Sequence, residues 1–240
     1  VHDAANAEAM GIYADPAVDM AGLAMWKDDV VDQLTSRVEK LCKANGVTLM
    51  EGTATFKDEH TARIAHSGDG QGVESVEFED CIIATGSSPI EIPGFSFDDD
   101  PVWTSRDALA VEEVPDELVV IGAGYIGMEL STMFAKIGAD VTVVEMLDSA
   151  LPAYDDDITR IVRSRAADLG VDFQFREGAT EWHETEHGID VITETEEGET
   201  ATYVGDKVLV AGGRQPVTDT LERDAIGLQP DDDRFLARDD

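Results

Sequence analysis

Residues 118–127 read Leu-Val-Val-Ile-Gly-Ala-Gly-Tyr-Ile-Gly, four apolar residues followed by three closely spaced glycines. The apolar run predicts a buried β-strand. Apolar residues at helical spacing from Met128 to Ile137 predict a helix that Gly138 ends, and a second apolar run follows at 141–144. Strand, glycine turn, helix and strand in this order predict a βαβ unit with a parallel sheet, and therefore an α/β fold of the Rossmann type.

Each of the three glycines meets a different physical requirement. Gly122 permits a tight turn, Gly124 lets the backbone approach a pyrophosphate, and Gly127 lets the helix pack closely on the strand. The free N–H groups and the positive end of the helix dipole then attract phosphates. Since every part of the unit occurs in register, the motif predicts a dinucleotide site formed by Gly122, Ala123, Gly124, Tyr125, Ile126 and Gly127.

Glu145 ends the second apolar run and predicts which dinucleotide binds. A carboxylate at this position accepts hydrogen bonds from the ribose hydroxyls of NAD and repels the 2′-phosphate of NADP. No arginine or lysine lies between Glu145 and Arg160 to bind such a phosphate. The sequence therefore predicts NAD as the cofactor.

The rest of the chain shows one long helical pattern and many short β-patterns. A helix is predicted over 22–45, where Val30, Leu34, Val38 and Leu41 are spaced helically before Gly46. A turn is predicted at 67–72, a linker around 93–100 and a polar β-meander at 179–204. Further strands are predicted at 47–51, 54–58, 61–66, 73–79, 81–84 and 207–211.

The charge of the chain is strongly negative, with 52 acidic against 17 basic residues and a net charge of −35. Such a surface repels nucleic acid and anionic lipid, and no apolar run approaches the ~18–20 residues of a membrane span. The acids recur along the whole chain, which favours the cytoplasm of a salt-loving organism, where salt screens their repulsion. Cys42 and Cys81 form no CxxC or CxxxxC pair and are expected to be small core residues.

One segment matches the HExxH pattern of zinc proteases, with His183, Glu184 and His187. That chemistry needs a helix, so that both histidines face one metal. Gly188 follows at once, and apolar residues then alternate as in a strand. We therefore expect a hairpin here and no metal site.

Three further motifs accompany the glycine turn in a fixed order, namely Gly52-Thr53-Ala54-Thr55-Phe56, then Ile82-Ile83-Ala84-Thr85-Gly86-Ser87-Ser88-Pro89, then Val208-Leu209-Val210-Ala211-Gly212-Gly213-Arg214-Gln215-Pro216. With them the chain resembles the flavoprotein pyridine nucleotide-disulfide oxidoreductases over essentially its whole length, and most of all those members that oxidise dihydrolipoamide.

The resemblance implies three domains and two cofactors, FAD and NAD. It implies part of an FAD-binding domain at 1–95, an NAD-binding domain at 96–216, and the start of a central domain at 217–240. It places Thr53, Ala54, Thr85, Gly86 and Ser87 along the FAD. On the NAD side it places Ala179, Ala211, Gly212, Gly213 and Arg214 together with the glycine turn, with Tyr125 over the nicotinamide pocket and Glu129 near the flavin.

The implied activity is the oxidation of dihydrolipoamide to lipoamide with reduction of NAD, on a lipoyl-carrying protein of a 2-oxoacid dehydrogenase complex. The family's first FAD motif, its CxxxxC pair, its later flavin-binding Gly-Asp motif and its His-Glu pair do not occur within residues 1–240. The chain is therefore expected to be an internal fragment without catalytic residues, taken from a cytoplasmic homodimer. Alternatives are another disulfide reductase, a pyridine-nucleotide transhydrogenase, or, if the chain is complete, a non-catalytic nucleotide-binding module.

Overall fold

The structure is a computed structural model that describes residues 11, 13, 17–66, 72–232 and 234–236. The described residues form two compact units. The first contains Pro89–Gly213 and the described residues up to Lys27, and the second contains Asp28–Ser88 and the residues from Arg214 onward. The domain boundaries after residues 95 and 216 remain predictions.

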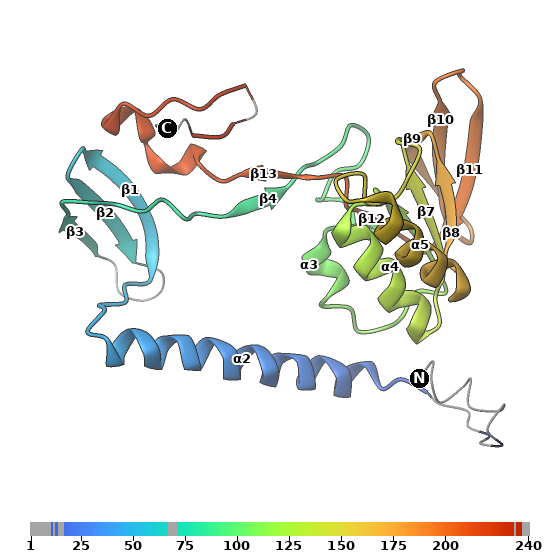
Figure 1. Cartoon of the computed structure of the whole chain (residues 1–240), viewed down its shortest axis with the longest axis horizontal. Coiled ribbons are helices and arrows are strands. Elements are labelled where there is room, and N and C mark those ends of the chain that lie inside the picture. The colour runs from blue at the N-terminus through green and yellow to red at the C-terminus, as the bar shows by residue number, and fades with distance from the viewer. Residues whose placement is uncertain (1–10, 12, 14–16, 67–71, 233, 237–240) are drawn as a thin grey trace. The chain divides into compact units, whose positions relative to one another are not determined.

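A five-stranded parallel sheet forms the centre of the first unit (Figure 1). Its strand order is β5-β12-β6-β7-β8, and every neighbouring pair is parallel. The α/β fold predicted from residues 118–127 is thereby confirmed. The strands are β5 (Val102–Trp103), β12 (Lys207–Val210), β6 (Glu117–Ile121), β7 (Asp140–Glu145) and β8 (Asp172–Phe175), and the helices are α3 (Ser105–Ala108), α4 (Tyr125–Ile137) and α5 (Asp156–Asp168).

Each face of this sheet carries its own core, because successive strand residues point to opposite faces. Leu118 and Val120 of β6 pack with Phe134 of α4 on one face. Val119 and Ile121 pack on the other face with residues of an antiparallel meander, among them Ile189, Val191 and the partly buried Trp182. The meander consists of β9 (Glu177–Thr185), β10 (Gly188–Thr195) and β11 (Thr200–Gly205). It confirms the meander predicted at 179–204.

The second unit is built around a three-stranded antiparallel sheet and a two-stranded one. The first comprises β1 (Gly52–Asp58), β2 (Thr61–His66) and β3 (Val73–Glu77), and the second pairs β4 (Ser87–Pro89) with β13 (Arg214–Pro216). Two 3₁₀ turns follow, η2 (Asp219–Leu221) and η3 (Arg223–Ile226). Residues 67–71 of the predicted turn lie outside the described residues.

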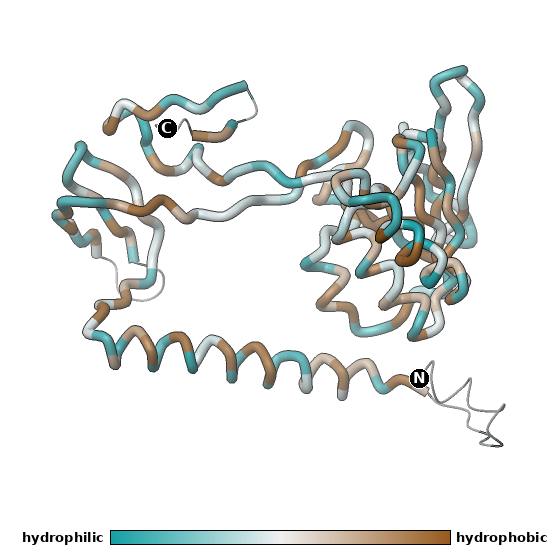
Figure 2. Tube along the Cα trace, in the orientation of Figure 1, coloured by the Kyte–Doolittle hydropathy of each residue, from teal (hydrophilic) through white to brown (hydrophobic). Residues whose placement is uncertain are grey.

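The predicted helix is present as α2 (Met20–Ala44), in which hydrophobic and hydrophilic residues alternate along the helix (Figure 2). None of its residues is buried. Among the described residues, we find no helix that combines the length and the apolar character of a membrane span.

Two predicted strands and the predicted burial of the cysteines are wrong. Residues 47–51 and 81–84 are not strands: Val47 and Leu49 are exposed, and Ile82 is 92% exposed. A strand requires a partner for its backbone groups, and no described segment pairs with either stretch. Cys81 is exposed for the same reason, and Cys42 on α2 is only half-buried.

Candidate nucleotide-binding site

The glycine turn lies at the carboxyl end of β6, where the order of the sheet reverses. On one side of β6 lie the next two strands along the chain, β7 and β8. On its other side lies β12, which comes later in the sequence. Open α/β sheets bind ligands at such a switch point, outside the carboxyl ends of the strands. Gly122–Gly127 follow β6, and Ala211–Gly213 follow β12, so both segments border this position.

Local geometry explains two of the three glycines. Gly122 has φ of 103°, and a Cβ atom there would lie 2.6 Å from the carbonyl oxygen of Ala211. A Cβ atom on Gly127 would lie 1.9 Å from the carbonyl oxygen of Gly122. No side chain fits at either position without moving the backbone.

Gly124 differs, because a Cβ atom there would meet nothing within 4 Å. Its φ of −69° suits any residue. Neither packing nor the backbone angle requires glycine at this position, whereas a pyrophosphate placed against the backbone does. Gly124 also caps α4 without a side-chain hydrogen bond, which leaves the first N–H groups of the helix for an anion. Tyr125 in this first turn is 55% exposed, and Glu129 is exposed.

Glu145 is buried, with 8% of its surface exposed. Its Oε2 accepts a hydrogen bond of 2.7 Å from the backbone N–H of Ala123, and its Oε1 accepts one of 2.9 Å from the N–H of Leu147. Each carboxylate oxygen has two acceptor sites, so one on each remains for a ribose hydroxyl. The carboxylate thus connects the glycine turn to the loop after β7, a role that its sequence position did not predict.

The loop after β7 has two further backbone anchors. Leu151 donates its N–H to the carbonyl oxygen of Ala123 at 2.9 Å, and Arg176 donates its N–H to the carbonyl oxygen of Leu147 at 3.0 Å. Both donors have left-handed backbone, with φ of 56° at Leu151 and 64° at Arg176. Non-glycine residues adopt this conformation at a cost of about 1–3 kcal/mol and concentrate at functional sites. Neither left-handed conformation was predicted from the sequence.

The other predicted NAD contacts lie at the ends of strands in the same unit. Ala211 donates its N–H to the carbonyl oxygen of Ile121 at 2.8 Å, which holds the end of β12 beside β6. Ala179 lies on β9 and packs against the core beneath the meander. Next to it the pairing with β10 is irregular, and a Cβ atom on Gly94 would lie 2.6 Å from the carbonyl oxygen of Thr180.

The residues predicted to contact FAD all lie in the second unit. Thr53 and Ala54 are exposed on β1. Thr85 donates its hydroxyl to the carbonyl oxygen of Val217 at 2.5 Å. Arg214 donates Nε to Oγ of Ser87 at 2.8 Å and Nη2 to the Ser87 carbonyl oxygen. Arg214 was predicted at the NAD site with Gly213, but its side chain binds the segment predicted for FAD.

Gly86 also joins the segment around Ser87 to the segment around Val217, since its carbonyl oxygen accepts the N–H of Val217 at 3.0 Å. Its φ of 75° is in the left-handed region, and a Cβ atom there would meet nothing within 4 Å. The backbone conformation alone therefore explains this glycine.

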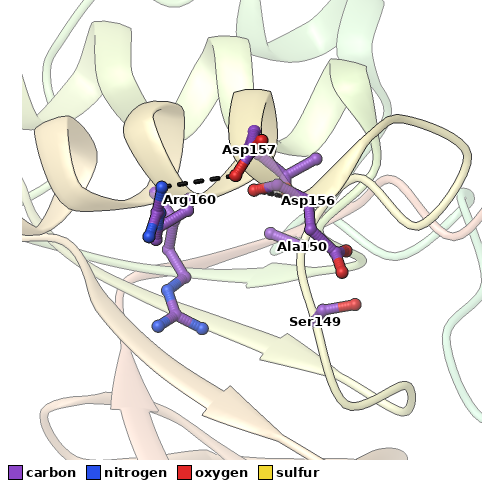
Figure 3. A pocket seen from close by; sticks show the side chains of 7 residues that line it. Ser149, Ala150, Asp156, Asp157 and Arg160 are labelled. Atoms are coloured by element: carbon purple, nitrogen blue, oxygen red, sulfur yellow. Dashed lines mark hydrogen bonds and ion pairs between the residues drawn. The ribbon is translucent and has the colours of Figure 1, made fainter.

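A pocket of about 270 Å³ lies beside the loop after β7 (Figure 3). Ser149 and Ala150 of the loop line it together with the first turns of α5. Arg160 there forms an ion pair with Asp157, with 3.4 Å between Nη2 and Oδ1. The pocket thus places two acidic and two basic side chains, Asp156, Asp157, Arg160 and Arg163, near the residues that follow Glu145.

The HExxH segment is extended, as predicted. His183 lies on β9, and His187 lies in the turn between β9 and β10, where its N–H binds Oγ1 of Thr185 at 3.2 Å. The same meander holds a polar cluster in which Thr193 and Tyr203 donate their hydroxyls to Oε2 of Glu177 at 2.8 and 2.9 Å. Burial and the bond to Glu177 raise the pKa of Tyr203 to about 12.

The pyridine nucleotide-disulphide oxidoreductase family matches residues 2–240 of the chain. The chain belongs to this family. The chain is 64% identical to a dihydrolipoyl dehydrogenase of Haloferax volcanii, over all of this chain and 50% of that protein. It is 59% identical to a dihydrolipoyl dehydrogenase of Halobacterium salinarum, over 99% of this chain and 50% of that protein.

A solved structure resembles the chain as well. The HOCl-induced flavoprotein disulfide reductase RclA from Escherichia coli superposes with a TM-score of 0.78 at 27% identity, over 92% of this chain and 49% of that one. The chain therefore spans about half the length of these relatives.

Proposed function

We propose that this chain is the NAD-binding half, with part of the FAD site, of an enzyme that oxidises dihydrolipoamide to lipoamide and reduces NAD. The likeness to two dihydrolipoyl dehydrogenases at 64% and 59% identity supports the reaction. The full-length protein is proposed to be a cytoplasmic homodimer that acts on a lipoyl-carrying protein of a 2-oxoacid dehydrogenase complex.

One observation carries the nucleotide assignment: neither packing nor backbone angle requires the glycine at 124, which starts a helix whose first N–H groups receive no side-chain hydrogen bond. The buried Glu145 beside it supports NAD over NADP. Its carboxylate is held by two N–H groups, so it is fixed in position before the ribose arrives.

The residues of this chain bind and orient, and the bound cofactors supply the two-electron chemistry. Gly122–Gly127 would hold the pyrophosphate, and Glu145 would fix the ribose. Thr53, Ala54 and Thr85–Ser87 would line the flavin. Oxidation of a dithiol substrate also needs a redox-active cysteine pair that takes up its two electrons by thiol–disulfide exchange, and Cys42 and Cys81 are not spaced as such a pair.

Two proteins test this proposal, the 240-residue chain and the full-length protein. We expect the 240-residue chain to bind NADH, measured by nucleotide fluorescence, more tightly than NADPH, to retain little FAD, and to show no turnover with dihydrolipoamide. The full-length protein is expected to be yellow and active. Turnover by the 240-residue chain, or a full-length protein that binds no NADH, would contradict the proposal.

A further inference from the structure

Arg176 combines two features in one residue. Its backbone is left-handed, with φ of 64°, where a glycine has no steric cost. Its side chain lies beside the loop that follows Glu145, with 3.9 Å between Nη2 and Oδ2 of Asp148. A residue kept in an unfavourable backbone conformation suggests that its side chain has a role.

The position of Arg176 relative to Glu145 follows from two hydrogen bonds. Glu145 binds the N–H of Leu147, and the carbonyl oxygen of Leu147 binds the N–H of Arg176. The backbone of Arg176 is therefore fixed to the loop that carries the ribose-binding carboxylate. An arginine near this carboxylate is the group that accommodates a 2′-phosphate in NADP-dependent proteins.

We propose that Arg176 is a specificity-determining residue, whose positive charge the nearby carboxylate of Asp148 offsets. The proposal rests on the proposed nucleotide function. Selection for NAD then has two parts: Glu145 repels a 2′-phosphate, and Asp148 places a second negative charge beside the cation that would bind one. Both side chains of the pair are largely exposed, 75% for Arg176 and 70% for Asp148, so removing Asp148 frees the guanidinium without opening the core.

The test compares four variants of the chain by their dissociation constants for NADH and NADPH, all at one potassium chloride concentration at which circular dichroism shows every variant to be folded. Glu145→Ser removes the repulsion, and Glu145→Ser/Asp148→Asn also frees the arginine. We expect the double variant to bind NADPH about tenfold more tightly than Glu145→Ser, because a charge-assisted hydrogen bond to phosphate is gained. Adding Arg176→Gly should abolish this gain and leave the affinity for NADH unchanged.

Two choices make the comparison specific. Glycine at 176 keeps the N–H that binds the Leu147 carbonyl oxygen and suits the φ of 64°, so this bond is present in all four variants, each of which lacks the Glu145 carboxylate. The matched control adds Arg160→Ala to the double variant, since Arg160 lies beside the same loop but pairs with Asp157. We expect this control to keep the gain in NADPH binding.

Three outcomes would overturn the proposal: no gain from Asp148→Asn, a gain that survives Arg176→Gly, or a gain that Arg160→Ala abolishes. If the proposed function itself is wrong, the chain without substitutions will bind neither NADH nor NADPH. This result differs from all three outcomes above.

Discussion

The backbone nitrogen of Ala123 lies 2.7 Å from Oε2 of Glu145. The residue that ends β7 is thereby bonded to the glycine turn that follows β6. A side chain expected to contact only the ligand is thus also part of the protein's own structure. Bonds from N–H groups to a buried carboxylate are charge-assisted, and they are stronger than bonds between neutral groups.

We expect Glu145→Gln to destabilise the nucleotide-free chain by about 1–3 kcal/mol, because its amide nitrogen cannot accept the second N–H. Urea unfolding measures this loss, and NADH binding should weaken in parallel. Asp157→Asn is the control, since Asp157 is an exposed carboxylate whose ion pair is also exposed. A Gln variant of unchanged stability that binds no NADH would mean that Glu145 acts on the ligand alone.

The glycines at 124 and 127 should respond oppositely to alanine. Gly127→Ala drives a methyl group into the Gly122 carbonyl and should cost about 1–3 kcal/mol or more of stability. Gly124→Ala meets open space, so the melting temperature should hold while NADH affinity falls at least about tenfold. Calorimetry and fluorescence titration separate the two effects. An unchanged affinity for NADH in Gly124→Ala would contradict the proposal that the pyrophosphate binds at this turn.

The sequence predicted the part of the site that depends on local pattern. Residues 118–145 carry the pattern of one strand–turn–helix–strand unit, and the structure has this unit. The prediction succeeded because apolar periodicity and glycine spacing depend only on residues that are close in sequence. Leu151 and Arg176 were missed since neither is a residue type that favours positive φ. Their conformations are imposed by hydrogen bonds to Ala123 and Leu147, which are distant in sequence.

At 81–84 the sequence predicted a strand that the structure does not contain. Its apolar residues carry a genuine β-pattern, but pairing is decided by a partner, and sequence pattern does not reveal whether one is present. Arg214 also has a contact that the sequence did not reveal. Its side chain hydrogen-bonds to Ser87, and its contact with NAD stays a prediction.

Ser131 on α4 is fully buried, and its hydroxyl has no hydrogen-bond partner in the described part of the chain. We expect Ser131→Ala to raise the free energy of unfolding by about 1 kcal/mol, because an unsatisfied polar group leaves the core and helix propensity improves. Chemical denaturation measures the change. Ser131→Thr keeps the hydroxyl and adds a methyl group, so it should destabilise. A loss of stability in the alanine variant would reveal a partner for the hydroxyl.

Tyr203 should contribute to the free energy of unfolding, and this contribution should be lost in strong base. Its pKa of about 12 in the folded chain exceeds the ordinary value of 10.0, so the folded state keeps the phenol proton longer than the unfolded state. The contribution is complete below pH 10 and falls as the pH rises to about 12. Tyr203→Phe should lack this component when denaturation is followed from pH 9 to 12. Identical pH dependence in both proteins would contradict the assignment.

The charge of −35 predicts that salt stabilises the chain. Raising potassium chloride to molar concentration shortens the Debye length to about 3 Å and screens the repulsion among acids. The melting temperature should therefore rise with salt, as the likeness to haloarchaeal proteins also suggests. A melting temperature independent of salt would argue against adaptation to a saline cytoplasm.

The two places where the chain crosses between Pro89–Gly213 and the second unit lie next to each other. Ile90 binds the carbonyl oxygen of Gly213 at 3.0 Å, and β4 pairs with β13 just outside these points. A segment whose first and last residues are neighbours behaves as an insert, which can be removed or transplanted without stretching the chain that receives it. Residues 89–213 therefore have the paired ends of a cassette: joined to another host at a surface turn, they would carry the whole glycine turn, Glu145 and its loop with them, and would leave behind only the residues up to Lys27 of the same unit.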